Sequence, residues 1–363
     1  MPSDLHPVHP QLARLYAALG DHLAGGRPDG IFEARLGGPG SVPGLDDLGA
    51  AEWQLDLLPF PPTEAQRAAL AGLGYALAAE TENRLTYTLT LSDALNVTLL
   101  SHDLGASHEQ KVLWEYLSQP AEEHARSAYR RAFLASGRFA ADAEFVPLAQ
   151  AAHVARTGVG PLDRAAALLS PLGIPWMFAA GWALDLHRHS ISGLKPSQPR
   201  DEASRPHEDV DVVVGREHQL VVGKALTGAG YRVSGVREGA YVPWTEPLEP
   251  PHFQLHAHRE GHEMLDLMLT DLSGDLWHYR RDPAVTLPLA RARLVSTLGL
   301  PYLAPEAALL FKATGANGRV RPKDQRDFEA VLPALGAAAR GWLATRLGED
   351  HRWQAALRAV NPE

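Results

Sequence analysis

Two aspartates in the middle of the chain are positioned to hold a metal ion. Asp209 and Asp211 stand two residues apart, just before the β-branched run Val212-Val213-Val214. Such a run is typical of a buried strand, and residues two apart on a strand point to the same face. The two carboxylates would repel each other unless a cation lay between them. Mg²⁺ suits this position because it prefers oxygen ligands and often bridges to nucleotide phosphates.

A third carboxylate, Asp266, lies in the otherwise apolar segment 264–269. Two-metal phosphoryl-type transfer usually needs a third acidic group near the first two. A lone aspartate among leucines and methionines is costly to bury without a partner. We therefore expect Asp266 to pair across the sheet with Asp209 and Asp211. The alternative is an ordinary carboxylate at a strand end or in a turn.

A glycine turn could bind the phosphates of a nucleotide. Gly181 and Trp182 follow a short apolar segment, 176–178, and precede a helical pattern. Backbone N–H groups at such a turn can face an anion, although glycine turns before helices are common. Three cations are candidates to neutralise a triphosphate: Arg205, Lys312 and Lys323. For each cation considered alone, ordinary surface charge is the alternative.

The composition is that of an ordinary globular protein. The chain has 363 residues, of which 45% are hydrophobic and 21% charged, and no apolar run is long enough to span a bilayer. It contains no cysteine, which excludes disulfides and thiolate metal sites. The N-terminus lacks the features of a signal peptide, so we expect a cytoplasmic protein that does not bind membranes. The net charge of −9 argues against broad electrostatic binding to nucleic acid, though not against a local basic patch.

The local patterns predict an α/β (α+β) protein with two domains, at 1–155 and 156–363, each a small mixed sheet flanked by helices, with a helical C-terminal tail. In the first domain, strands are expected over 53–58, 84–91 and 95–100, and helices over 63–73 and 110–133. In the second, strands are expected over 176–178 and 209–214, with a hairpin formed by 253–258 and 263–269. Helices are expected there over 219–227, 305–313 and 324–335.

The two halves share a spacing that indicates an internal repeat. Asp56 lies in a predicted strand, 19 residues before Tyr75, and a predicted helix and Gly74 stand between them. Asp211 lies 20 residues before Tyr231 in the same arrangement. This self-similarity predicts two copies of one strand–helix–strand plan. Chance is the alternative, because strand–helix–glycine sequences are common in α/β proteins.

The C-terminal half resembles the aminoglycoside adenylyltransferase branch of the nucleotidyltransferase superfamily. The motifs that carry the resemblance occur in the family's order over roughly 160–335: Ala180-Gly181-Trp182-Ala183, Arg205-Pro206-His207-Glu208-Asp209-Val210-Asp211, the strand containing Asp266, Trp277-His278-Tyr279-Arg280, Tyr302-Leu303-Ala304-Pro305-Glu306 with Lys312, and Lys323-Asp324-Gln325-Arg326-Asp327-Phe328. Two departures from the family pattern are Ala180 in place of the first glycine and a longer loop over 193–204.

The resemblance implies a nucleotidyltransferase fold in both domains and a role for each matched residue. It implies that Asp209 and Asp211 bind Mg²⁺, two ions in all, and that Asp266 completes this site or acts as general base. Near the NTP it places Gly181, Trp182, Arg205, His207, Lys312, Lys323 and Asp327. The implied reaction moves an NMP, AMP in the leading case, from an NTP to a hydroxyl of a small molecule that resembles an aminoglycoside.

The N-terminal half resembles the GrpB-like family, itself related to nucleotidyltransferases. The resemblance rests on the loop Gly40-Ser41-Val42-Pro43-Gly44-Leu45, on the strand Trp53-Gln54-Leu55-Asp56-Leu57, and on the helical segments around Trp114 and Tyr129. In this alignment Gln54 takes the place of the first carboxylate and Asp56 that of the second, while the third strand carries no acid. We therefore expect a degenerate domain with a structural or binding role.

Two other functions remain open from the sequence. One is a toxin-like transferase that modifies tRNA or a protein, which the acidic net charge disfavours. The other is a non-catalytic nucleotide-binding scaffold, which the three acids of the second half disfavour. Four histidines could also suggest a zinc site, although a polar hairpin face near the acids is the simpler interpretation: His252, His256, His258 and His262.

Overall fold

The structure, a computed structural model, describes residues 10–20, 30–58, 60–81, 84–89, 95–101, 106–191, 207–237, 240–259, 262, 264–272, 275–314 and 320–359. The chain divides into two compact units. The first unit is Met1–His153 with Val236–Pro243, and the second is Val154–Gly235 with Trp244–Glu363. Within the described residues, no helix is long and apolar enough to cross a membrane.

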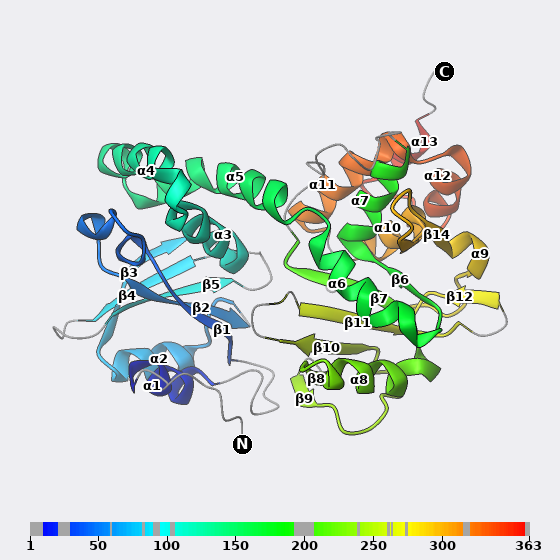
Figure 1. The fold of residues 1–363 in the computed structure, drawn as a ribbon, viewed down its shortest axis with the longest axis horizontal. Coiled ribbons are helices and arrows are strands. Elements are labelled where there is room, and N and C mark those ends of the chain that lie inside the picture. The colour runs from blue at the N-terminus through cyan, green and yellow to red at the C-terminus, as the bar shows by residue number, and fades with distance from the viewer. Residues whose placement is uncertain are drawn as a thin grey trace. The chain divides into compact units, whose positions relative to one another are not determined.

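The first unit is a mixed sheet with helices on both faces (Figure 1). Its strands are β1 (Gly30–Gly37), β2 (Glu52–Leu58), β3 (Tyr75–Thr81), β4 (Arg84–Leu89) and β5 (Asn96–Ser101), in the order β1-β2-β5-β4-β3. Its helices are α1 (Pro10–Leu19), α2 (Glu64–Gly72), α3 (Ala106–Ser118), α4 (Glu123–Ser136) and α5 (Arg138–Thr157), with short 3₁₀ turns η1 (Pro39–Ser41), η2 (Asp46–Leu48) and η3 (Pro120–Glu122). Helices α1 and α2 cover one face through an apolar core, and α3, α4 and α5 lie over the other.

The second unit is also a mixed sheet covered by helices. Its sheet has the order β14-β15-β6-β7-β11-β10-β8, formed by β6 (Trp176–Phe178), β7 (Asp209–Gly215), β8 (Arg232–Arg237), β10 (Gln254–His258), β11 (Met264–Thr270), β14 (Arg293–Val295) and β15 (Pro301–Leu303). The short strands β12 (Leu276–His278) and β13 (Thr286–Pro288) pair with each other and lie between β11 and β14 in the chain, whereas β9 (Ala240–Pro243) falls in the segment assigned to the first unit. The helices are α6 (Gly160–Leu169), α7 (Ala180–Ile191), α8 (Gln219–Gly228), α9 (Leu289–Ala292), α10 (Pro305–Thr314), α11 (Pro322–Val331), α12 (Ala337–Ala344) and α13 (Gln354–Arg358), with 3₁₀ turns η4 (Ser170–Leu172), η5 (Arg216–His218) and η7 (Leu332–Ala334).

Local sequence explains why the central elements form. The alternate residues Val210, Val212 and Val214 of β7 are fully buried, as expected of a β-branched strand in a core. Helix α2 begins with a capping box, in which Thr63 accepts from the Gln66 backbone and the Gln66 side chain accepts from the Thr63 backbone. These features agree with the predicted α/β class and with the strands and helices expected in both halves.

The two sheets share one topology. In each, one strand pairs antiparallel with its neighbour on one side and parallel with its neighbour on the other: β2 with β1 and β5, and β7 with β6 and β11. The next two strands are antiparallel, β4 and β3 in one sheet and β10 and β8 in the other. Two residues beyond their last residue, helices α2 and α8 are each followed by a glycine with positive φ, Gly74 at 88° and Gly230 at 85°, and then by a buried tyrosine. This shared path supports the predicted repeat.

The strand register corrects one detail of that repeat. Two residues beyond the tyrosine, Leu77 shares a row with Tyr87, Val97 and Trp53, as Val233 does with Ala257, Leu265 and Val210. The next row aligns Gln54 with Asp211, Thr98 with Asp266 and Thr86 with His256. The alignment of Asp56 with Asp211 is therefore wrong by two residues, and Glu52 corresponds to Asp209. The two-residue period of a strand hides such a shift in the sequence.

Candidate active site

Three carboxylates meet on two neighbouring parallel strands of the second unit. Asp209 and Asp211 lie two residues apart in β7, and Asp266 of β11 is the register partner of Asp211. The expected pairing of the third acid with the first two is thus confirmed. Asp209 and Asp211 are partly exposed, whereas Asp266 is buried. All three line one cavity of about 220 Å³.

The electrostatic environment disfavours negative charge on the two β7 aspartates. Burial raises the pKa of Asp209, and the nearby charge of Glu208 raises it further. Burial raises the pKa of Asp211 well above its usual value, and the charges of Asp209 and Asp266 add to this effect. Such a cluster would be stabilised by a bound cation, which favours the ionised form of neighbouring carboxylates.

Asp266 has a different environment from the other two acids. Burial alone would raise its pKa, but the neighbouring His256, then Arg280 and Gln254, lower it below the usual value. The Gln254 side chain donates a hydrogen bond to Asp266 Oδ2 at 2.9 Å, and His256 Nε2 lies 3.5 Å from Oδ1. Asp266 is therefore held in one orientation and kept ionised at neutral pH. The pairing of β10 with β11 places His256 beside Asp266, and the local sequence around His256 does not predict this contact.

The glycine turn lies directly beside β7. The Ala179 backbone N–H donates to the Asp211 carbonyl at 2.9 Å, and the chain then enters α7 at Ala180. Ala180 has φ of 46°, the left-handed conformation that glycine adopts at no steric cost. Gly181 is buried and lines the cavity. Ala180 stands where the family pattern has its first glycine, and its backbone still adopts a conformation that favours glycine.

Trp182 and His207 brace the beginning of β7. Trp182 Nε1 donates to the Asp209 carbonyl at 2.9 Å, and its ring lies 4.2 Å from that of His207. His207 Nε2 is 2.7 Å from Asp185 Oδ2. His207 lines the cavity and Trp182 does not. The hydrogen bond from Trp182 goes instead to β7, the strand that carries the acids. Asp185, a lone acid on α7, was not predicted as part of the site.

The two predicted lysines both line the cavity, in different settings. Lys312 is buried, with Nζ 3.1 Å from Asp324 Oδ1 and 2.7 Å from Asp327 Oδ2. Lys323 Nζ lies 3.4 Å from Glu208 Oε1. Lys312 thus joins α10 to α11, whereas Lys323 lies beside the loop that leads into β7. Arg205 lies outside the described residues.

Further cations line the cavity that sequence reasoning did not assign: Arg280, Arg281 and Arg321. Arg280 follows β12, its charge lies near Asp266 and Asp211, and burial lowers its pKa. Arg321 donates to Asp324 Oδ2 at 2.7 Å. The cavity therefore presents acids on one wall and several cations around them. The motif around Trp277 marked Arg280, but nothing local in the sequence marked Arg281 or Arg321.

No family model matches the sequence, and no curated protein matches it. Among solved structures, the chain is similar to the lincosamide antibiotic adenylyltransferase LnuA bound to lincomycin, with 16% identity, a TM-score of 0.35, and coverage of 48% of this chain and 97% of that one. It is similar to ANT(2")-Ia in complex with adenylyl-2"-tobramycin, with 15% identity, a TM-score of 0.37, and coverage of 52% and 97%. It is similar to the Megavirus polyadenylate synthase, with 10% identity, a TM-score of 0.28, and coverage of 82% of this chain and 61% of that one. Likeness at this level does not by itself establish a shared activity.

Proposed function

We propose that the second unit is a Mg²⁺-dependent nucleotidyltransferase that moves an NMP, AMP in the leading case, from an NTP to a hydroxyl of a small molecule. The observation that carries this proposal is the set of three carboxylates, Asp209, Asp211 and Asp266, on adjacent parallel strands at a cavity rimmed by cations. Oxygen donors close together on a rigid sheet are what phosphoryl-type transfer requires.

The residues present fit Mg²⁺ as a shared ligand of protein and nucleotide. Among the residues that the structure describes, no group of three acidic or histidine side chains is placed to hold a metal ion by itself, so substrate oxygens would have to complete the site. Mg²⁺ usually keeps several waters and is bound through one or two carboxylates together with substrate phosphates. Asp209 and Asp211 would supply the protein ligands, and Asp266 would complete the set. The bound ion would neutralise charge that develops on the transferring phosphate.

The protein's own groups would orient the reactants. Lys323 and Arg280 lie around the acids and would contact the triphosphate, while the N–H groups at Gly181 would face it. The acceptor oxygen would attack the α-phosphorus in line, forming one O–P bond as the bond to pyrophosphate breaks. The proton of the acceptor hydroxyl would pass to Asp266, which Gln254 already holds in position. Positioning and charge neutralisation would supply most of the catalysis.

A labelling experiment tests this function directly. The full chain is incubated with Mg²⁺, each of the four NTPs labelled at the α- or the γ-phosphate, and a panel of acceptors that includes aminoglycosides, other hydroxylated small molecules, tRNA and protein. We expect the α-label in the acceptor and the γ-label in pyrophosphate. Transfer of the γ-label would indicate a kinase, and transfer of the α-label only to tRNA or protein would support the toxin-like alternative. NTP binding without transfer would support a scaffold.

A further inference from the structure

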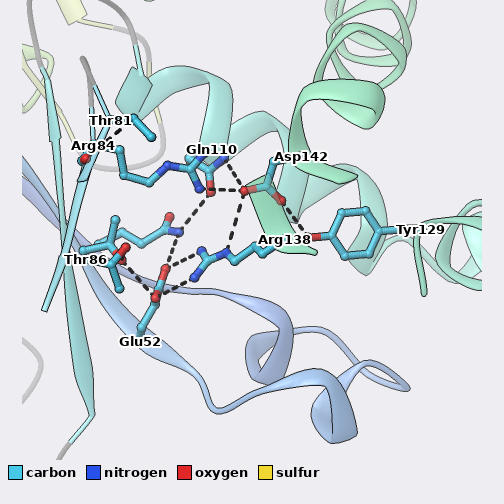
Figure 2. Close-up of polar contacts among 10 residues, drawn as sticks. Glu52, Thr81, Arg84, Thr86, Gln110, Tyr129, Arg138 and Asp142 are labelled. Atoms are coloured by element: carbon cyan, nitrogen blue, oxygen red, sulfur yellow. Dashed lines mark hydrogen bonds and ion pairs between the residues drawn. The ribbon is translucent and has the colours of Figure 1, made fainter. Parts of the chain in front are cut away.

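A buried polar network occupies the sheet face of the first unit that corresponds to the acidic face of the second (Figure 2). Glu52 and Gln54 of β2 and Thr98 of β5 hold the positions of Asp209, Asp211 and Asp266. All three residues of the first unit are buried, Glu52 with 3% exposure and the others with none. One acid therefore remains where the second unit has three.

The guanidinium of Arg138, on α5, lies against this remaining acid. Its Nη1 donates to Glu52 Oε2 at 2.9 Å and its Nη2 to Oε1 at 2.5 Å. This two-pronged geometry is the strongest that an arginine and a carboxylate can form. Gln54 donates to Glu52 Oε1 at 3.1 Å and Thr98 to Oε2 at 3.0 Å. Although burial alone would raise the pKa of Glu52, these contacts, led by Arg138, lower it.

A second acid, Asp142, closes the other side of the network (Figure 2). Its carboxylate accepts from Arg84 of β4 at 2.6 Å and from Tyr129 of α4 at 2.6 Å, and Arg138 Nε lies 3.7 Å away. Gln110 of α3 donates to the same carboxylate at 3.3 Å. Two arginines thus balance two buried acids, and the contacts join the sheet to all three covering helices.

The turn η1, which follows β1, differs from the corresponding turn of the second unit. Where the second unit enters the long helix α7, the first unit forms only the three-residue turn η1. Ser41 Oγ donates to the Gly38 carbonyl at 2.6 Å, and a side chain at Gly40 would meet the backbone N of Ala51 at 2.3 Å. The turn packs against its own chain, so it lacks the helix N-terminus that binds a phosphate in other nucleotide sites.

We propose that the first unit has exchanged the divalent cation of a nucleotidyl-transfer site for the guanidinium of Arg138, and that it binds neither Mg²⁺ nor an NTP. A positive group of the protein now lies against the acid that is retained, and the covering helices hold it there. The proposed function enters only in naming the lost ligand, because the contacts among Glu52, Arg138 and Asp142 are present whatever the second unit does.

Mn²⁺ binding to the full chain tests the exchange. Mn²⁺ uptake is measured by electron paramagnetic resonance, with and without ATP, for the wild type, Glu52→Gln and the double variant Asp209→Asn/Asp211→Asn. We expect Glu52→Gln to bind the same number of ions as the wild type, and the double variant to lose them all. Loss of any bound ion in Glu52→Gln would overturn the proposal. A wild type that binds no Mn²⁺ would refute the function of the second unit, but it would agree with the exchange in the first.

Thermodynamic coupling provides the second readout. Arg138→Met removes one partner of a buried ion pair, so we expect the folding equilibrium constant to fall roughly a hundredfold or more. Adding Glu52→Gln to Arg138→Met should recover part of this loss, because Glu52 is then no longer a charge without its partner. If Arg138→Met does not fold, the uncharged polar variant Arg138→Gln takes its place. Additive effects of Glu52→Gln with either of these Arg138 variants would show that no such pair exists.

Discussion

Replacing Asp211 with asparagine should stabilise the metal-free protein while it abolishes nucleotidyl transfer. Asparagine keeps the shape of the side chain and removes one of three clustered negative charges. Burial and the neighbouring acids raise the pKa of Asp211 well above its usual value, so the folded state disfavours its ionised form. The cost of Asp211 is absent below the unfolded-state pKa of about 3.9 and grows as the pH rises through the raised folded-state value.

The magnitude follows from the spacing of the charges. Carboxylates two residues apart on one strand are about 7 Å apart, and those on neighbouring strands about 5 Å apart. At an effective dielectric constant near 20, each repulsion amounts to roughly 2–4 kcal/mol. Lys312 and Lys323 lower the pKa of Asp211 and so offset part of this repulsion. We expect a net gain of about 1–2 kcal/mol, or about 2–8 °C in Tm for a unit of this size.

Calorimetry in EDTA at neutral pH and again at about pH 4 measures this gain. The gain should be present at neutral pH and should shrink at the lower pH. Glu52→Gln is the matched control, because the same neutralisation in the first unit removes a favourable ion pair and should lower Tm. With excess Mg²⁺ and ATP, the wild type should gain stability by mass action and Asp211→Asn should gain less. A metal-free Asp211→Asn that melts below the wild type would refute the electrostatic reasoning.

Three further predictions concern other parts of the structure. Ala180→Gly should raise the free energy of unfolding by about 1 kcal/mol, measured by chemical denaturation, because glycine adopts the positive φ of this position without strain. Lys312→Met should lower it by about 3 kcal/mol or more in the same assay, because Asp324 and Asp327 would lose a buried partner. Acid should destabilise the protein in a Tm–pH series: Arg321 and Lys312 lower the pKa of Asp324 despite its burial, so its contribution is present above the unfolded-state pKa and is lost as the pH falls toward the folded-state value. Asp324→Asn should flatten that acid limb; an unchanged limb would contradict its role.

Much of the second unit could be predicted from local sequence. The β-branched run after Asp211 predicted β7, and the apolar run around Asp266 predicted β11. Short apolar runs of this kind are typical of buried strands, and the structure confirms both strands, whose parallel pairing the sequence did not predict. The residues that line the cavity were harder to predict from the sequence, because Arg281 and Arg321 reach it from segments whose local sequence is that of ordinary surface loops.

The first unit shows what local patterns cannot supply. Arg138 and Asp142 lie one turn apart on α5, a spacing common among exposed ion pairs, yet they contact Glu52 and Arg84 from distant strands. Burial in the folded chain, and not spacing, makes these charges a network. The two-residue error in aligning Asp56 with Asp211 has a similar origin. Residues two apart on a strand face the same side, so only the pairing of β2 with β5 distinguishes one alignment from the other.

The dependence of label transfer on Asp211 is the most direct test of the proposed chemistry. Initial rates of transfer from α-labelled ATP, with Mg²⁺ and the best acceptor, are compared for the wild type, Asp211→Asn and Asp56→Asn. We expect Asp211→Asn to lose about a hundredfold to a thousandfold in kcat, as for removal of a group that acts in the transition state, while it remains folded. Asp56→Asn, the control in the first unit, should retain wild-type turnover. Wild-type transfer by Asp211→Asn would contradict the assignment of the active site.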